Sequence, residues 1–394
     1  MTHTTLLPGA TLGVMGGGQL GRMFVHAAQS MGYFTAVLDP DAASPAGRVS
    51  HHHVQTDYLD AQGLAELARL CEAVTTEFEN VPAPALAQLA VQRPVAPAAE
   101  AVAIAQDRSA EKAHFTRIGV PCAPYAVITD QASLAQVDAG LLPGILKTAR
   151  MGYDGTGQVR VRTREELAEA WARLQRVPCV LEQMLPLKDE CSVIVARGRD
   201  GAMVNLPVQH NLHRDGILAV TTVHEGVLPP ALSAQAVAAA RAVAEGLAYV
   251  GVLCVEFFVL QDGSLVVNEI APRPHNSGHY SIDACDVSQF ALQVRTLAGL
   301  PLVAPRQHSP TVMLNLLGDL WFDANAQRAQ AGEQAVEPPW DAVLALPGVH
   351  LHLYGKSKPA RARKMGHLTL TGATPQQVRA TALQAAALLG LPPF

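Results

Sequence analysis

The stretch Val252–Glu269, which reads VLCVEFFVLQDGSLVVNE, contains the clearest structural signal in this 394-residue chain. Its first half alternates in the manner of a β-strand, Asp262-Gly263 is a typical hairpin turn, and the rest is the expected return strand. Counting outward from a two-residue turn places Glu256 directly opposite Glu269, with their Cβ atoms roughly 4.5–5.5 Å apart. A longer loop would shift this register.

Two carboxylates placed side by side repel each other, particularly among apolar neighbours such as Phe257 and Val267. A bound cation would explain the arrangement. Mg²⁺ bridged to nucleotide phosphates is the natural candidate, because it prefers one or two carboxylates together with phosphate oxygens and water. We therefore predict Glu256 and Glu269 as magnesium ligands. The alternative is that one glutamate points into solvent or pairs with an arginine.

A second signal lies upstream, where the apolar run Gly144–Leu146 ends in Lys147 and is followed by the glycine-rich segment MGYDGTGQ at residues 151–158. Such a loop can cover nucleotide phosphates and exclude water, while the ammonium group neutralises their charge. The pattern therefore indicates a nucleotide site. The alternative is a glycine-rich hairpin connection with an incidental lysine.

The first hundred residues alternate between strand and helix patterns. Strands are expected at Thr11–Met15, Phe34–Leu38 and Ala73–Thr76, with helices from about Leu20 to Met31 and from Leu64 to Leu70. This order predicts a doubly wound parallel sheet.

The loop after the first strand, GGGQLG at residues 16–21, fits the pattern G-x-G-x-x-G, and Asp39 ends the second strand. This pattern is compatible with a dinucleotide such as NAD, with the phosphate of a ribonucleotide, or with tight packing alone. The glycines and the helix N-terminus secure only a backbone that can approach an anion. The downstream sequence favours a phosphate-bearing substrate over NAD.

Composition excludes several classes of protein. The formal net charge is -5, so no general surface for nucleic acid or anionic membranes is expected. The six cysteines are scattered without a CxxC pair, which indicates reduced thiols. No apolar run approaches the roughly 20 residues that span a bilayer, and no signal segment is recognisable, so we expect a cytoplasmic protein. The tract His51–His53 has no partners at metal-ligand spacing and is predicted to lie on the surface.

Changes in residue pattern along the chain predict three structural units. We expect an N-terminal Rossmann-like domain over residues 1–106 and a mixed domain over residues 107–300, with a small lid at about 120–185. A linker with Pro301, Pro305 and Pro310 then leads into a C-terminal unit over residues 301–394.

Five longer runs are more specific than any single motif: GQLGRM at 18–23, GYDG at 152–155, HNLHRDGI at 210–217, NEIAPRPHNSGH at 268–279 and RKMGH at 363–367. Together they resemble the 5-(carboxyamino)imidazole ribonucleotide synthase family of the ATP-grasp superfamily. This resemblance implies an ATP-grasp fold of the α/β and α+β classes. It also implies carboxylation of the amine of aminoimidazole ribonucleotide, with ATP, Mg²⁺ and bicarbonate, through carboxyphosphate. A homodimer is the family expectation.

The resemblance also implies three groups of site residues. The nucleotide would be bound by Arg108, Lys147, Gly152, Tyr153, Asp154, Gly155, Thr156, Gly157, Gln158, Glu182, Gln183, Met184, Leu185, Glu190, His213, Asn268 and Glu269. The ribonucleotide would be bound by Gly18, Gln19, Leu20, Glu77, Asn80, Lys356, Arg361, Arg363 and Lys364. The residues expected to act in catalysis are Arg273, His275, Asn276, Asp154 and Lys147.

Some of these roles have simpler alternatives. His213 by itself would more often be a surface or capping histidine, and the basic C-terminal run is usually a solvated face. Pro272 and Pro274 stiffen the segment around Arg273, whose planar guanidinium suits bicarbonate or carboxyphosphate. The alternative for Arg273 is an ion pair with an acid such as Asp283 or Asp286.

The chain also departs from the family pattern. It has Thr156 where the family generally has Lys or Arg, and Met151 where the family has Gly, which puts a direct charge contact from this loop to a phosphate in doubt. Rival interpretations are another ATP-grasp enzyme, such as a formate-using glycinamide ribonucleotide transformylase or a biotin carboxylase, and an NAD-binding protein. The transformylase and the carboxylase lack the HNLH and PHNSGH runs.

Overall fold

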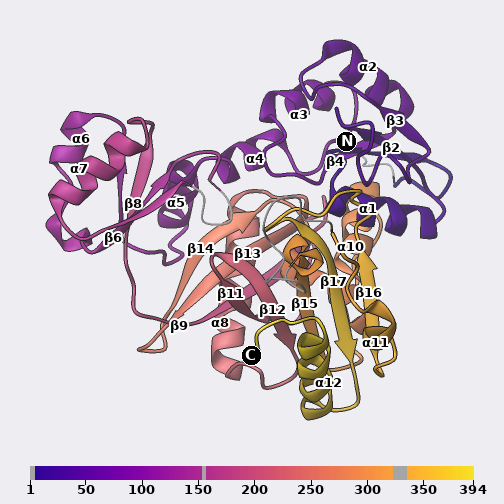
Figure 1. The fold of residues 1–394 in the computed structure, drawn as a ribbon. Helices are drawn as coiled ribbons and strands as arrows, with labels where there is room; N and C mark the ends of the chain where they lie inside the picture. Colours follow the sequence, from indigo (N-terminus) through magenta and orange to yellow (C-terminus); the bar gives the residue numbers. More distant parts are fainter. Residues whose placement is uncertain (1–4, 153–156, 323–334) are drawn as a thin grey trace.

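The computed structural model describes residues 5–152, 157–322 and 335–394, which form three sheets (Figure 1). The N-terminal sheet has the order β3-β2-β1-β4 and is parallel in every pair. Its strands are β1 (Thr11–Met15), β2 (Phe34–Leu38), β3 (His52–Val54) and β4 (Ala73–Thr76), with helices α1 (Gln19–Ser30), α2 (Ala61–Leu70), α3 (Ala83–Ala90) and α4 (Ala99–Ala105). The predicted parallel sheet is confirmed. The histidine tract falls at its edge strand β3.

A distant helix completes the core of this sheet. Helix α10 (Gln289–Ala298) packs against α1, and its Val294 and Leu297 are buried in one cluster with Phe24 and Val37. The N-terminal unit is therefore joined to the rest of the molecule by shared apolar packing.

The second sheet has the order β5-β8-β6-β7 and projects from the body (Figure 1); it lies in the region predicted to be a lid, and we refer to it by that name. Its elements are β5 (Tyr125–Ile128), α6 (Gln131–Ala135), β6 (Gly144–Thr148), β7 (Gln158–Val161), α7 (Arg164–Arg173) and β8 (Cys179–Gln183). The two helices cover one face, because their apolar residues Leu134, Leu167 and Trp171 pack against the strands. The lid therefore has a small core of its own.

The third sheet is the largest and runs in the order β14-β13-β9-β11-β12-β15-β17-β16, with β10 paired to β9. The strands are β9 (Leu187–Arg197), β10 (Met203–Asn205), β11 (Gln209–Arg214), β12 (Ile217–Val223), β13 (Gly251–Leu260), β14 (Leu265–Ala271), β15 (Thr311–Leu317), β16 (Val349–Leu353) and β17 (Lys364–Thr371). Strands β15–β17 come from the predicted C-terminal unit, yet they extend the sheet of the preceding domain.

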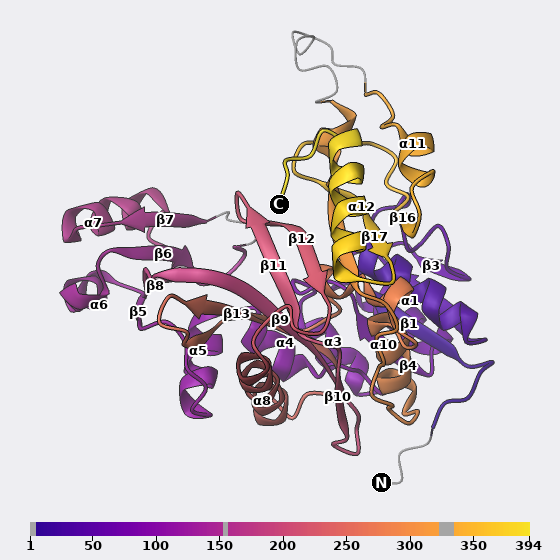
Figure 2. The same cartoon turned by 90° about the horizontal axis from the view of Figure 1, so that it is seen from below.

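Helices cover this large sheet at both ends (Figure 2). They are α5 (Arg108–Arg117), α8 (Pro230–Gly246), α9 (Ser281–Ala284), α11 (Trp340–Leu344) and α12 (Pro375–Leu388). Helix α8 packs on β9 and β13, and α12 packs on β15 and β17. Within the described ranges no helix has the length and apolar character needed to cross a membrane. All six cysteines lie in these ranges and are free thiols.

The β13–β14 hairpin places Glu256 opposite Glu269, as predicted, but its turn differs from the prediction. The loop covers residues 261–263, because the Leu260 N–H donates to the Ser264 carbonyl at 2.8 Å. Gly263 has φ +85°, the left-handed conformation that closes a three-residue hairpin loop. The predicted two-residue turn is therefore wrong.

A β-bulge corrects the register that this longer loop shifts. Val259 pairs with Leu265, which is one residue out of step with the predicted count. Further along, the register shifts again, and the extra residue Asn268 restores the pairing of Glu256 with Glu269. Two deviations from regular geometry thus cancel.

Candidate functional site

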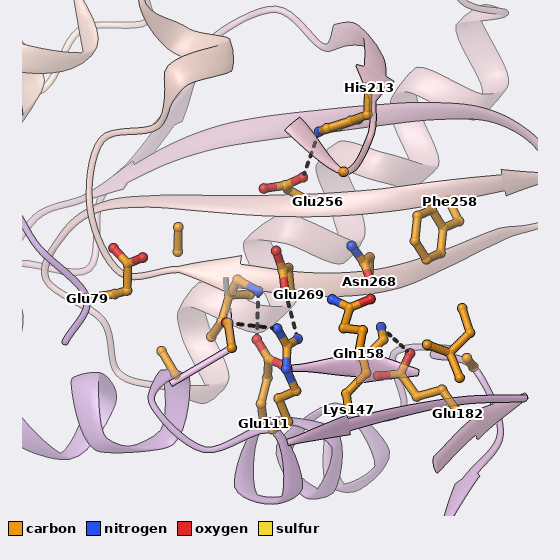
Figure 3. Close-up of a pocket in the computed structure, with 18 of the residues that line it drawn as sticks. Glu79, Glu111, Lys147, Gln158, Glu182, His213, Glu256, Phe258, Asn268 and Glu269 are labelled. Atoms are coloured by element: carbon orange, nitrogen blue, oxygen red, sulfur yellow. Dashed lines mark hydrogen bonds and ion pairs between the residues drawn. The ribbon is translucent and has the colours of Figure 1, made fainter. Parts of the chain in front are cut away.

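A cavity of about 370 Å³ lies where the lid, α5, β11 and the β13–β14 hairpin meet (Figure 3). It is lined by the following predicted nucleotide residues: Arg108, Lys147, Gly152, Gln158, Glu182, Gln183, Met184, Leu185, Glu190, His213, Asn268 and Glu269. Gly157 is placed beside β6, where its carbonyl accepts the Thr148 N–H at 3.0 Å. Tyr153, Asp154, Gly155 and Thr156 lie outside the described residues.

Two lysines share one buried glutamate at the floor of this cavity. Lys147 Nζ lies 3.0 Å from Glu182 Oε2, and Lys112 Nζ lies 3.4 Å from the other oxygen. Burial by itself would raise the pKa of Glu182, but the two ammonium groups lower it below its ordinary value. Because the group carries one negative and two positive charges, it has a net positive charge that suits an anionic ligand.

Two consecutive residues of α5 hold the backbone of β14 at the bulge. The Glu111 carboxylate accepts the Ile270 N–H at 2.7 Å, and Lys112 donates to the Asn268 carbonyl at 2.8 Å. Both side chains are fully buried. These two hydrogen bonds fix the backbone on either side of Glu269.

The bulge has a direct consequence for the side chains. Consecutive residues of a regular strand point to opposite faces. At the bulge, Asn268 and Glu269 both line the cavity, together with Glu256 from the facing strand. Bulges re-aim side chains in this way. Three oxygen-bearing side chains are therefore gathered on one wall.

Each glutamate of the facing pair has its own cationic or hydrogen-bonding neighbour. Arg108 Nη1 lies 2.9 Å from Glu269 Oε2, and His275 Nε2 lies 3.0 Å from Glu256 Oε1. Burial raises the pKa of Glu256, but His275, together with other nearby positive groups, outweighs it and lowers the pKa below the ordinary value. Glu256 is thus ionised, as a magnesium ligand needs to be.

The wall also contains an amide oxygen that is available to a metal ion. Among the described residues, the buried Asn268 Oδ1 has no hydrogen-bond partner. Two carboxylates and an amide oxygen are the hard oxygen donors that Mg²⁺ prefers. The residues present therefore fit a magnesium ion.

His213 approaches the carboxylate wall from β11. Its Nδ1 lies 2.6 Å from Glu190 Oε2, and its Nε2 lies 3.9 Å from Glu256. Burial by itself would lower the pKa of His213, but Glu190 and Glu256 raise it above its ordinary value. The histidine is therefore held between two acids inside the cavity, and it is neither a surface nor a capping residue.

The segment after β14 brings Arg273, His275 and Asn276 to the same cavity. Arg273 forms an ion pair with Glu79, which also lines the cavity. Neither acid considered as its partner from the sequence is involved, because Asp283 contacts His352 and Asp286 contacts Arg306.

Asn276 is the residue of this segment whose side-chain amide lacks hydrogen bonds to the described residues. It is 7% exposed, and neither its amide oxygen nor its amide nitrogen has a hydrogen-bond partner in the described part of the chain. An unpaired buried amide is costly. The amide is thus open to a ligand that offers both a donor and an acceptor.

Three backbone amides of the first glycine loop already have carboxylate partners. The Gly17 N–H donates to Asp39 at 2.7 Å, and the N–H groups of Gly18 and Gly21 donate to the Glu77 carboxylate at 2.9 and 3.1 Å. Protein carboxylates thus occupy three amides of the loop, which counts against a phosphate at these amides, and phosphate binding by the loop stays a prediction. The same contacts argue against the pyrophosphate of NAD.

The remaining predicted substrate residues are only partly brought together. Asn80 and Lys364 line the cavity, and the Lys356 Nζ donates to the Lys364 carbonyl at 2.6 Å. Arg361 lies 3.6 Å from Asp319, and Arg363 donates to the Lys358 carbonyl at 2.9 Å. Gln19 and Leu20 begin helix α1, and Leu20 packs against Phe290 and Tyr354.

Sequence reasoning missed three residues of this site: Glu79, Glu111 and Lys112. Glu79 stands between the predicted Glu77 and Asn80, so its position was a usable signal. Glu111 and Lys112 share a helix with apolar core residues, and their burial is visible only once α5 packs against β14.

Comparison with known proteins places the chain in a family. The N5-carboxyaminoimidazole ribonucleotide synthase of Brucella melitensis is 43% identical over 376 residues, which cover 94% of this chain and 98% of that protein. The synthase of Bacillus subtilis is 37% identical over 370 residues, covering 94% of this chain and 93% of that protein. This chain belongs to the N5-carboxyaminoimidazole ribonucleotide synthase family.

Family models for single domains agree with membership of the synthase family. Residues 9–106 match the ribonucleotide synthetase preATP-grasp domain, and residues 113–290 match the ATP-grasp domain. Residues 311–381 match the phosphoribosylaminoimidazole carboxylase C-terminal domain. The predicted ATP-grasp fold is therefore confirmed.

Solved structures of the synthase family have the same fold as this chain. The Staphylococcus aureus synthetase complexed with ADP has a TM-score of 0.87 at 35% identity, covering 98% of this chain and 99% of that chain. The Aspergillus clavatus synthase in complex with ADP and 5-aminoimidazole ribonucleotide has a TM-score of 0.86 at 31% identity, covering 97% and 99%.

Proposed function

We propose that this chain carboxylates the amine of 5-aminoimidazole ribonucleotide in purine biosynthesis, with ATP as the energy source and bicarbonate as the carbon source. Family membership makes the chain an ATP-using ATP-grasp ligase. The observation that carries the finer proposal is the continuity of one cavity, which joins Lys147 and Glu182 on the lid to Arg273 and Asn276 after β14.

The nucleotide would lie between the lid and the large sheet. Lys147 and Arg108 are the positive charges beside its phosphates, and residues 182–185, which begin at the end of β8, form the hinge where the adenine would be read. Glu190 would accept hydrogen bonds from the ribose, with His213 beside it. Lys147 is available for this because Lys112 also neutralises Glu182.

Glu256 and Glu269 would hold Mg²⁺, with Asn268 as a neighbouring oxygen donor. When bound, the ion would neutralise charge on the phosphates during transfer. The contribution of the chain is geometric, since the α5 contacts and the bulge hold these side chains in place before any ligand arrives.

The carboxyl chemistry would occur beside Arg273, His275 and Asn276. A bicarbonate oxygen attacks the γ-phosphorus of ATP, ADP leaves, and carboxyphosphate forms. The amine of the ribonucleotide then attacks the carboxyl carbon, phosphate departs with that bicarbonate oxygen, and the amine gives up a proton. Arg273, fixed by Glu79, offers a planar cation, and Asn276 offers its unfilled amide.

The ribonucleotide would bind on the N-terminal side of the cavity, near Asn80 and Glu79. Because Glu77 and Asp39 occupy the glycine amides, we assign the phosphate to the basic residues Lys356 and Lys364 instead. Gly18, Gln19 and Leu20 would shape the edge of this region without contacting the phosphate.

An isotope experiment tests the carboxyphosphate route. The protein is given bicarbonate labelled with heavy oxygen, and the released phosphate is examined before the label exchanges with water. We expect one labelled oxygen in the phosphate. Unlabelled phosphate together with normal carboxylated product would overturn the route and the role assigned to Arg273.

Binding measurements separate Arg273 from the nucleotide site. The Arg273→Ala variant should lose carboxylation and keep ATP binding, because Arg273 is paired with Glu79, whereas Lys147 is paired with Glu182 on the lid. Since this variant leaves Glu79 unpaired, the double variant with Glu79→Gln is the matched control for folding. Restored carboxylation in the double variant would contradict the assignment.

A homodimer and a cytoplasmic location are part of the same proposal. Both rest on the family resemblance and on the sequence composition. Light scattering of the purified chain across a concentration series tests the dimer, and a monomer at all concentrations would reject it.

A further inference from the structure

A second cluster of ionisable side chains lies where α9 meets the β16–β17 hairpin, apart from the nucleotide cavity. His350 and His352 are two residues apart on β16 and therefore share one face. His367 on β17 is the cross-strand partner of His352. Asp283 of α9 covers these histidines. None of these four residues, all of them within the described ranges, lines the nucleotide cavity.

The carboxylate of Asp283 contacts two histidines of this cluster. Asp283 Oδ2 lies 2.8 Å from His352 Nε2, and Asp283 Oδ1 lies 3.6 Å from His350 Nδ1. One ligand atom each from Asp283, His352 and His367 lie within 4.8 Å of one another. A carboxylate and imidazoles converging from separate elements are a typical donor set for zinc.

His367 supplies an independent observation. It is 0% exposed, its Nδ1 lies 2.9 Å from the Tyr354 hydroxyl, and its buried Nε2 has no hydrogen-bond partner among the described residues. Leaving a buried ring nitrogen unpaired is unfavourable. A histidine that ligates a metal typically donates its other N–H to a polar neighbour. Tyr354 is placed to accept such a bond, which leaves the lone pair of Nε2 for a ligand.

We propose that Asp283, His352 and His367, with His350 as a fourth donor, form a binding site for one transition-metal ion of the zinc class. Imidazole nitrogens favour such ions over Mg²⁺, which prefers oxygen ligands. This site is therefore chemically distinct from the Glu256–Glu269 pair. It depends only on side chains of α9 and the hairpin, so it is independent of the proposed function.

Loading the site requires a small local adjustment. The rings of His352 and His367 are stacked, with 4.6 Å between centroids and 12° between planes. Zinc lies in the plane of each ligand ring at about 2.0–2.1 Å from the nitrogen. One ring must therefore rotate, and the hydrogen bond between His352 and Asp283 is exchanged for two metal bonds.

The position of the site suggests what the ion would do. Helix α9 directly follows the segment that contains His275 and Asn276, and the β16–β17 hairpin carries Lys356 and Lys364. A metal ion would link these two parts. We therefore expect it to stabilise the junction between the carboxylation segment and the basic residues.

Calorimetric titration of the full chain with zinc chloride, after removal of metals with a chelator, tests the site directly. The wild type should bind one ion per chain with an increase in melting temperature. His367→Asn and Asp283→Asn should both lose this binding and this increase. Two variants are used because His367 is fully buried and Asp283 is partly exposed, so the proposal stays testable if His367→Asn does not fold. Circular dichroism in chelator checks the fold of each.

Two control variants separate this site from other zinc-binding groups. His52→Asn alters the exposed histidine tract on β3, and Glu256→Gln alters the group of Cys254, Glu256 and His275. Both controls should keep the binding. The proposal is overturned if the wild type shows no saturable binding, or if folded His367→Asn and Asp283→Asn bind as the wild type does. Loss of the binding in either control would overturn it as well.

Discussion

Two hairpins of the large sheet each place two side chains of the same kind directly opposite each other. On β13–β14, Glu256 faces Glu269, and on β16–β17, His352 faces His367. The carboxylate pair needs a bulge and two buried contacts from α5 to hold it. The imidazole pair has an uninterrupted register from Val349 to Leu353 and simply stacks.

The difference follows from charge. Facing carboxylates repel each other, so their geometry has to be imposed by the surrounding structure and compensated by cations. The two imidazole rings stack face to face, and Asp283 contacts His352 from α9. The carboxylate pair is therefore held in place for a hard cation, whereas the imidazole pair offers nitrogen ligands but needs a ring rotation before it can bind an ion.

The largest expected effect comes from removing one charge of the carboxylate pair. Glu269→Gln should reduce turnover by several orders of magnitude, because phosphoryl transfer depends on metal-assisted charge neutralisation. Its stability should stay within about 1 kcal/mol, because the Glu269 side chain is 38% exposed and a glutamine there keeps an oxygen that can accept a hydrogen bond from Arg108. Steady-state kinetics at saturating Mg²⁺ measure this.

The matched control for this variant is Glu66→Gln. Glu66 also pairs with an arginine, Arg69, at 2.6 Å, but on an exposed helix outside the cavity. Activity should be unchanged there. Near-normal turnover in Glu269→Gln would remove Glu269 from the site.

A second prediction concerns Lys112 of α5, which holds the bulge, and leaves Glu256 and Glu269 unchanged. Lys112→Met removes the bond to the Asn268 carbonyl and one of the two cations beside Glu182. We expect a loss of about 3 kcal/mol in the free energy of unfolding, since a buried charge loses a partner. The Mg²⁺ concentration needed for half-maximal activity should rise, because Asn268 and Glu269 are no longer held.

Lys188→Met, at an exposed lysine, is the control for the loss of a positive charge. Urea denaturation and a Mg²⁺ titration of activity measure the two effects. An unchanged Mg²⁺ requirement in Lys112→Met would mean that the bond from Lys112 to the bulge stabilises the fold without positioning Glu256 and Glu269.

A third prediction concerns the loop of the other hairpin. Burial, together with Arg363 and Lys364, lowers the pKa of Lys356 to about 8. The ammonium is therefore present below this pH and lost above it. If Lys356 holds the substrate phosphate, KM for the ribonucleotide should rise several-fold above about pH 8, while KM for ATP changes little.

Lys356→Arg sharpens this test because a guanidinium stays charged throughout the range. The rise in KM should disappear in that variant. A rise that persists unchanged would assign the pH dependence to another group.

The smallest expected effect comes from Gly263→Ala, which tests whether the turn or the bulge at Asn268 sets the register of the hairpin. Gly263 has φ +85° and an added Cβ would meet nothing within 4 Å, so Gly263→Ala costs only backbone strain, about 1 kcal/mol. Since the bulge at Asn268 lies between the turn and the pair, activity should be unchanged. A large loss of activity in the folded variant would show that the turn sets the register.

The sequence by itself determined the elements and much of the membership of the site. Strand alternation located the β13–β14 hairpin, and glycine and lysine patterns located the residues that line one cavity. These are local properties, since the period of a strand and the conformational needs of a turn are written in neighbouring residues. The roles of the lining residues stay predictions.

Tertiary structure decided which partner each charged group has. Arg273 pairs with Glu79, which is 194 residues away, and Glu77 occupies the amides of a loop 56 to 59 residues earlier. The opposition of Glu256 and Glu269 arises from a longer turn and a bulge that cancel. A buried charge has to find its partner wherever packing brings one close, so such pairings depend on the whole fold and cannot be counted along the chain.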